Sequence, residues 1–109
     1  MDRLSRLEQR PLAGGGTLLV ARTFRQRLLG LAGLRELPPH CALLITGCDS
    51  VHTAWMRFPI DVAFLDASGG VLRVAEDLRP WRLAWCRQAA AAVETRAGQA
   101  AALGFRLSP

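Results

Sequence analysis

The stretch from Cys41 to Asp77 constrains the fold most, because residues that break regular structure divide it into short apolar segments. Gly47 and Pro59 separate some of them, and Ala67-Ser68-Gly69-Gly70 is typical of a hairpin loop, in which Gly supplies a positive φ. An Asp at the start of such a loop commonly caps its own turn, as Asp66 would here. The pattern predicts an antiparallel meander of four strands: Cys41 to Thr46, Ser50 to Met56, Ile60 to Leu65 and Val71 to Glu76.

The N-terminal half of the chain is expected to add a strand and a helix. Thr17 to Ala21 has the length and composition of a buried strand, and it follows a flexible Gly14-Gly15-Gly16 break. Thr23 and Gln26 have the spacing of a capping box, which satisfies free amide hydrogens at a helix start. A helix from Phe24 to Leu34 is therefore predicted. Its apolar residues recur at spacings of three and four, namely Phe24, Leu28, Leu31 and Leu34. Two arginines, Arg25 and Arg35, can lie on the solvent-facing side of this helix.

The C-terminal part of the chain is compatible with two secondary structures. Ala89 to Ala92 favour a helix by propensity, whereas Ala91 to Arg96 alternates as a strand does. In the second interpretation, Gly98 opens a short helix that runs through Leu103 and ends at Gly104. The residue pattern alone leaves both interpretations open.

Length and composition indicate one globular domain. A chain of 109 residues that is 50% hydrophobic can bury one core. We expect a partly flexible N-terminal extension over residues 1–16 and a single domain over residues 17–109. No apolar stretch approaches the ~20 residues of a membrane-spanning helix, and the charged first ten residues are unlike a secretory signal. A cytoplasmic location is expected.

The net charge of +5 raises nucleic-acid binding as a hypothesis, because clustered cations attract phosphates. All 14 basic residues are arginine, a bias typical of a GC-rich coding genome. They are scattered, without the runs or interleaved aromatic residues of single-stranded nucleic-acid platforms. Nucleic-acid binding is therefore the weakest alternative.

The cysteines give little support to a disulfide framework or a metal site. Cys41, Cys48 and Cys86 are an odd number and lack C-x-x-C spacing. Cys48 and His52 invite a metal or nucleophile interpretation, but four residues of strand span about 13 Å, whereas ligands of one zinc lie within about 4 Å of each other. Only a sharp bend or help from His40 would rescue chelation. We predict no metal and no other cofactor, and a packed thiol beside a hydrogen-bonded histidine.

Arg57 and Asp61 are the strongest candidates for a site. A Phe58-Pro59 turn between two strands should bring the guanidinium and the carboxylate together. They would then form an ion pair that fixes the corner, or the floor of a polar ligand pocket. The second interpretation adds three neighbours as ligand-binding residues: His52, Thr53 and Trp55.

Two tryptophans form a separate candidate. Trp81 and Trp85, around Arg82, have the composition of a stacking surface for a sugar, a peptide or an aromatic ligand. The alternative is that they cover one end of a small sheet.

Residues 50–66 carry a Met-Arg pair, a short turn and an Ile-Asp strand, in the run SVHTAWMRFPIDVAFLD. On these residues the sequence resembles the uncharacterised prokaryotic domain-of-unknown-function family 192, whose signature is a Met-Lys/Arg pair, a turn and a Leu/Ile-Asp strand. The resemblance covers roughly residues 17 to 107. Three other segments agree in order and spacing: Ala21-Arg22-Thr23 through Arg27 and Gly30-Leu31, Pro80-Trp81-Arg82, and Val93-Glu94 through Ala97-Gly98.

The resemblance implies a compact, mainly β fold with one or two short helices, and a strand at Val93, so we predict the strand there. It implies no agreed activity. Members typically continue into a Gly-Asp turn and a final strand where this chain ends at Arg106-Leu107-Ser108-Pro109. We expect that strand to be missing or supplied by another chain, with homodimerisation through the uncovered sheet edge. Ala32 also stands where a Met is common.

The predicted fold class is α+β, mainly β: a compact antiparallel sheet or partly open barrel with one main helix and one short C-terminal helix. The favoured function is a non-enzymatic bacterial binding or accessory domain, whose shallow pocket takes a small ligand or a protein partner. No pair of titratable groups has the spacing that a general acid and base would need. A small hydrolase-like enzyme using Cys48 or His52, and a nucleic-acid-binding protein, are the alternatives.

Overall fold

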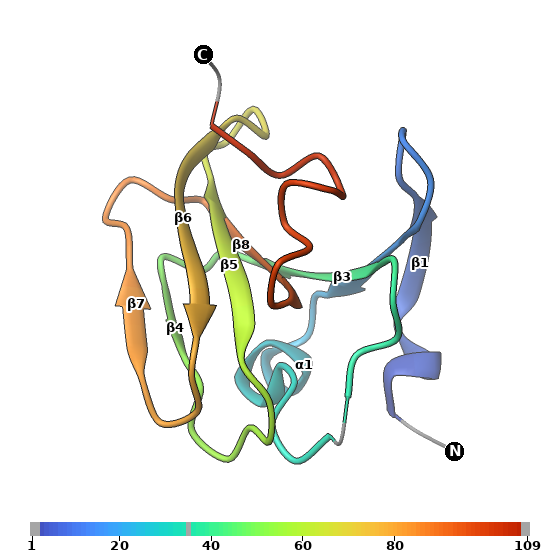
Figure 1. The fold of residues 1–109 in the computed structure, drawn as a ribbon, viewed down its shortest axis with the longest axis vertical. Coiled ribbons are helices and arrows are strands. Elements are labelled where there is room, and N and C mark those ends of the chain that lie inside the picture. The colour runs from blue at the N-terminus through green and yellow to red at the C-terminus, as the bar shows by residue number, and fades with distance from the viewer. Residues whose placement is uncertain (1–2, 35, 108–109) are drawn as a thin grey trace.

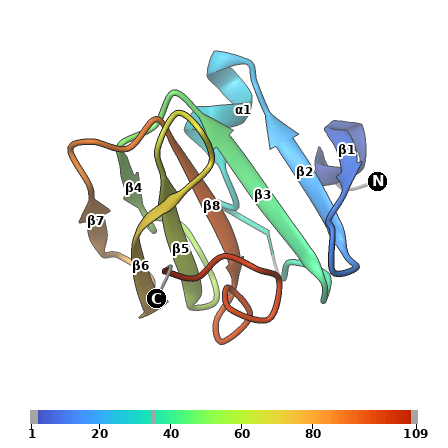
Figure 2. The same ribbon diagram turned by 90° about the horizontal axis from the view of Figure 1, so that it is seen from above.

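Six strands form one mixed sheet in the computed structural model, which describes residues 3–34 and 36–107. Figure 2 shows their order across the sheet. From one edge to the other they are β1 (Glu8–Pro11), β2 (Thr17–Ala21), β3 (Cys41–Thr46), β8 (Ala91–Arg96), β5 (Ile60–Leu65) and β6 (Val71–Leu78). β2 and β3 run parallel, and every other neighbouring pair is antiparallel.

The predicted antiparallel sheet or partly open barrel is therefore wrong. After β2 the chain passes through α1 (Phe24–Leu29) and returns to the sheet in the same direction as β3. A parallel pair requires a crossover of this kind. β8 also lies between β3 and β5, so the strands do not form a simple meander. The sequence pattern indicates strands but not their partners, so it does not determine the topology.

A second sheet pairs β4 (Ser50–His52) with β7 (Leu83–Trp85), and it stands beside β5 and β6 in Figure 1. The predicted strand from Ser50 to Met56 is correct only as far as His52, because the chain turns at Trp55, whose φ is 66°. β6 continues to Leu78, beyond its predicted end. The strands predicted at residues 17–21, 41–46, 60–65 and 91–96 are confirmed.

The predicted main helix is also wrong in length. α1 has six residues, although its capping box is confirmed: Gln26 N donates to Thr23 Oγ1 and Thr23 N donates to Gln26 Oε1, both over 3.1 Å. The helix ends at Gly30, whose φ of 48° leaves the helical region. Part of the predicted helical pattern lies outside the described residues, namely Arg35 and the side chains of Phe24, Arg25 and Leu28.

The predicted short helix after Gly98 does not form in the described chain, where residues 97–104 make turns. The amides of Leu103, Gly104 and Phe105 donate to carbonyls four, three and five residues earlier, so no regular ladder develops. Two amides at the start of this segment donate instead to a carboxylate oxygen of Asp61. That side chain holds the segment against the sheet.

Apolar side chains cover both faces of the six-stranded sheet. On one face, Phe64 belongs to a cluster that includes Leu31 after α1 and Val51 of β4. On the other face, Val93 belongs to a cluster completed by Leu103 and Phe105. A 3-10 helix, η1 (Arg3–Arg6), also places buried Leu4 in the first cluster. In the part of the chain described, no helix has the length and apolar character to cross a membrane.

Candidate functional site

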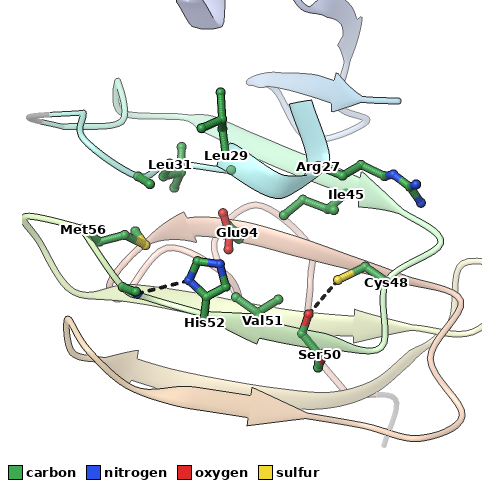
Figure 3. A pocket seen from close by; sticks show the side chains of 13 residues that line it. Arg27, Leu29, Leu31, Ile45, Cys48, Ser50, Val51, His52, Met56 and Glu94 are labelled. Atoms are coloured by element: carbon green, nitrogen blue, oxygen red, sulfur yellow. Dashed lines mark hydrogen bonds between the residues drawn. The ribbon is translucent and has the colours of Figure 1, made fainter. Parts of the chain in front are cut away.

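A cavity of about 50 Å³ lies between α1, β4 and β8. Figure 3 shows Glu94 in the middle of its lining, with Met56 and Leu31 toward one end and Arg27 and Cys48 toward the other. A wider hollow of about 230 Å³, here called the outer hollow, adjoins it, since both are lined by Arg27, Ile45, Cys48, Ser50 and His52. The remaining lining of the cavity comes from Leu29, Gly30, Ala32, Val51 and Ala54.

Glu94 is the most unusual residue of this site. It projects from β8 on the same face as buried Ala92, because side chains alternate along a strand. Its side chain is only 2% exposed, and Oε1 has no hydrogen-bond partner among the described residues. Burial raises the pKa of Glu94 to about 8, because removal from water penalises the charged form. The carboxyl group is therefore mostly protonated and uncharged at neutral pH.

Arg27 supplies the positive charge of the site from the last turn of α1. One terminal nitrogen, Nη1, donates to Thr46 O over 3.2 Å. It also occupies the space beside Gly47, where an added Cβ would lie 2.9 Å from it. The Nε of Arg27 is buried and, within residues 3–34 and 36–107, has no partner. Arg27 Nε and Glu94 Oε1 are the only buried side-chain polar atoms of the described chain without a partner, and both residues line the cavity.

His52 and Cys48 complete the polar lining. His52 Nδ1 accepts a hydrogen bond from Ala54 N over 3.3 Å, so the proton of a neutral ring lies on Nε2. Cys48 Sγ donates to Ser50 O over 2.8 Å. Burial raises the pKa of the Cys48 thiol, which opposes the thiolate form that a nucleophile requires.

The predicted ion pair between Arg57 and Asp61 is not formed. Arg57 is exposed and has no ion pair among the described residues. Asp61 is 3% exposed and accepts three backbone hydrogen bonds, from Asp77 N over 2.9 Å, Gly98 N over 3.0 Å and Ala100 N over 3.1 Å. Asp61 therefore binds the last residues of β6 and the turn segment after β8 on the sheet face opposite Glu94, and it does not line the cavity.

Thr53 holds two loops together through hydrogen bonds to their backbone groups, and it does not line the cavity. Its fully buried Oγ1 accepts from Arg82 N over 2.7 Å and donates to Arg79 O over 2.6 Å. Its carbonyl accepts from Met56 N and Trp81 N over 3.2 Å and 3.1 Å. These bonds join the turn after β4 to the loop between β6 and β7.

The tryptophans gather outside the cavity. Trp55 is 69% exposed, and its ring meets that of Trp81 edge to face at a centroid distance of 4.9 Å. Both residues have positive φ, 66° and 63°. Leu83 and Trp85 point outward from β7 on either side of buried Ala84. We call Trp55, Trp81, Leu83 and Trp85 the tryptophan face.

The predicted site residues are thus separated. Of the residues predicted to bind or stack on a ligand, only His52 lines the cavity. Trp55 and Trp81 belong to the tryptophan face, and Thr53 and Asp61 bind backbone groups. The sequence pattern indicates no role for Arg27 or Glu94. The signal available for Glu94 was a carboxyl group on the same strand face as an apolar Ala92, which is unexpected in a buried strand.

Other features of the described chain give weaker sites. Hollows of about 220 and 320 Å³ lie beside Asp61 and beside Leu4, but neither has a buried polar atom without a partner. Over the described ranges, no three His, Cys, Asp or Glu side chains group closely enough to hold a metal ion.

Comparisons with known proteins support the fold. The profile of a family described as "Uncharacterized ACR" matches residues 12–108. A protein of unknown function from Novosphingobium aromaticivorans superposes with a TM-score of 0.79 at 20% identity, covering 97% of this chain and 86% of its own. A proposed transcription regulator from Sinorhizobium meliloti gives a TM-score of 0.73 at 24% identity, covering 93% and 85%. No curated protein matches the sequence.

Proposed function

Because the chain belongs to the DUF192 family, whose description names no activity, we propose a function from the site itself: a binding module that holds a small ligand in the cavity over Glu94. The observation that carries this proposal is the unsatisfied Oε1 of buried Glu94. A buried polar atom without a partner is destabilising by about 1–3 kcal/mol, so native proteins rarely retain one without a role or an occupant.

The size of the space favours a small ligand. Sites for drug-sized molecules take about 300–1,000 Å³, whereas this cavity has about 50 Å³ and widens into the outer hollow of about 230 Å³. Its lining combines apolar side chains with five polar residues, namely Arg27, Cys48, Ser50, His52 and Glu94. A few polar groups on an apolar wall are typical of ligand pockets.

The hydrolase-like alternative has less support. A catalytic cysteine needs a low pKa, and burial shifts the pKa of Cys48 in the opposite direction. The Cys48 thiol also donates its hydrogen to the Ser50 carbonyl and not to His52. These observations favour binding over thiol catalysis.

A thermal-shift screen of small molecules tests the proposal. We expect the wild type to be stabilised by at least one compound, and Ile45→Phe to lose that stabilisation because the added ring fills the cavity that Ile45 lines. Leu44→Phe is the matched control, since Leu44 packs in the cluster on the opposite sheet face. The same ligand response in both variants, or no response to any compound, would sink the proposal.

A second candidate function, binding of single-stranded nucleic acid, is favoured by the tryptophan face. Exposed aromatic rings stack on bases, and exposed Arg79 and Arg82 flank Trp81 with cations for phosphates. The description of the Sinorhizobium meliloti protein as a proposed transcription regulator is in line with this candidate.

Salt dependence tests this second candidate. An oligonucleotide of mixed sequence should bind with an affinity that falls steeply with salt, and Trp55→Ala should weaken it about tenfold. Binding that is absent, or independent of salt, would remove the candidate.

A further inference from the structure

We propose that the cavity takes a small organic anion with an uncharged hydroxyl at its far end, whose acid group binds Arg27 and whose hydroxyl meets Glu94. This inference rests on the proposed function and names its ligand class. It follows from the difference between two polar groups that line the same cavity, the cationic Arg27 and the buried carboxyl group of Glu94.

The Arg27 side favours an anion. Its guanidinium stands over the turn at residues 46–47, at the border of the outer hollow, and its buried Nε has no partner in the described chain. Among the described residues, no Asp or Glu lines the outer hollow. A carboxylate is the natural partner of a guanidinium, because it can accept two parallel hydrogen bonds.

The Glu94 side favours an uncharged hydrogen-bonding group. A protonated carboxyl group can donate one hydrogen bond and accept another, as a hydroxyl can. A second anion there would meet a fully buried acid, and ionising that acid in an apolar wall is unfavourable. An ammonium group would need Glu94 to ionise, and it would share a narrow space with Arg27.

The titratable groups that line the cavity together with Glu94 come from two elements and one loop. Arg27 lies on α1, His52 on β4, and Cys48 between β3 and β4. Arg27 is the cation of this set, and Asp49, beside Cys48, is exposed. The lining between Arg27 and Glu94 includes the apolar side chain of Ile45, as Figure 3 shows. It suits a short hydrocarbon chain.

A matched set of four-carbon probes tests the ligand class: 4-hydroxybutyrate, butyrate, 1,4-butanediol and 4-amino-1-butanol. Molecules of this size bind weakly, with Kd on the order of 1 mM, so ligand-observed NMR is the suitable measurement. We expect 4-hydroxybutyrate to bind at least about fivefold more tightly than butyrate and the diol, and the amino alcohol to bind most weakly.

Variants assign each end of the probe. In Arg27→Gln, 4-hydroxybutyrate should no longer bind more tightly than the diol. In Glu94→Leu, it should no longer bind more tightly than butyrate. Glu94→Gln should keep that second advantage, because an amide also donates and accepts. Arg87→Gln, at an exposed arginine outside the cavity, should change no affinity.

The outcomes separate the two levels of inference. Tightest binding by the amino alcohol, lost in Glu94→Leu, would overturn the anion and leave the binding module intact. The same holds if none of the four probes binds while the screen yields another ligand sensitive to Ile45→Phe. Failure of both the probes and the screen would overturn the ligand class and the proposed function together.

Discussion

Asp61 and Glu94 are both buried carboxyl groups, and their surroundings give them opposite roles. Asp61 accepts three backbone hydrogen bonds, which fix the chain around it. Glu94 has an oxygen without a partner beside a cavity, which favours the neutral acid. The first arrangement stabilises the fold, whereas the second leaves a polar group available to a ligand.

Glu94→Gln should change how stability depends on pH. The folded pKa of about 8 lies above the unfolded value of 4.5, so the stability contributed by the protonated form is complete below pH 4.5. It is then lost by about 1.4 kcal/mol per pH unit as the pH rises toward 8. Urea denaturation at several pH values should show this decline in the wild type relative to the variant. Parallel pH profiles for the two proteins would contradict the account.

Asp61→Asn should destabilise the fold by about 3 kcal/mol. The asparagine amide nitrogen is itself a donor, so backbone N–H groups that now bind Asp61 would be left without an acceptor. The exposed Asp77→Asn is a suitable control, with an expected change within about 0.5 kcal/mol. Chemical denaturation measures both. A loss at Asp61 as small as that at Asp77 would show that the end of β6 and the segment after β8 do not depend on the Asp61 side chain.

At the scale of elements, the short α1 creates the cavity. Gly30 ends the helix with a φ of 48°, and an added Cβ would lie 3.3 Å from Glu94 Oε1. The chain then turns through residues 31–34 and does not continue along the sheet as a helix. A longer helix would place side chains where the cavity lies.

Gly30→Ala should therefore both destabilise the protein and crowd the site. A positive φ with a ψ of −124° is strained for any residue with a Cβ, so we expect a loss of about 1–3 kcal/mol, together with weaker ligand binding. Gly14→Ala is the matched control, because nothing lies near its added Cβ and its φ is not positive. Equal stability of the two variants would contradict this interpretation of α1.

The elements show which local signals carry over from sequence to structure. The Thr23 and Gln26 capping box and the strand at Ile60 to Leu65 depend on neighbouring residues, and both are confirmed. Asp66 also caps its own turn, accepting from Ser68 N and Gly70 N. By contrast, the polar strand β1 and the parallel pairing of β2 with β3 depend on partners far along the chain, and no local pattern reports them.

At the scale of the whole molecule, the four internal strands of the six-stranded sheet form the centre and the other strands are peripheral. β2, β3, β8 and β5 have neighbours on both sides, whereas β1 and β6 are the edges of the sheet. β1 carries charged residues and Pro11, features that discourage further strand pairing. β4 and β7 form only a small separate sheet.

Amide hydrogen exchange should follow this arrangement. We expect the slowest exchange in the internal strands β2, β3, β5 and β8, which should open only with global unfolding, and faster exchange in β1, β4 and β7. Measurement by NMR at neutral pH resolves the strands individually. Protection in β1 equal to that in β8 would contradict the division into centre and periphery.

The candidate site was the least predictable part, since it is assembled from distant segments. Arg27, His52 and Glu94 are far apart in the sequence, and the parallel pairing and the central position of β8 bring them together. The sequence pattern predicts a site around Arg57 and Asp61. In the structure Arg57 is exposed to solvent, and Asp61 lies on the sheet face opposite Glu94.

The most direct test is an NMR titration of the Glu94 side-chain carboxyl carbon between pH 4 and 9, a range that spans its ordinary and expected pKa. An uncharged acid beside the cavity predicts a midpoint near 8 in the free protein. A midpoint near the ordinary value of 4.5 would mean that Glu94 is ionised at neutral pH, and it would contradict the proposed site.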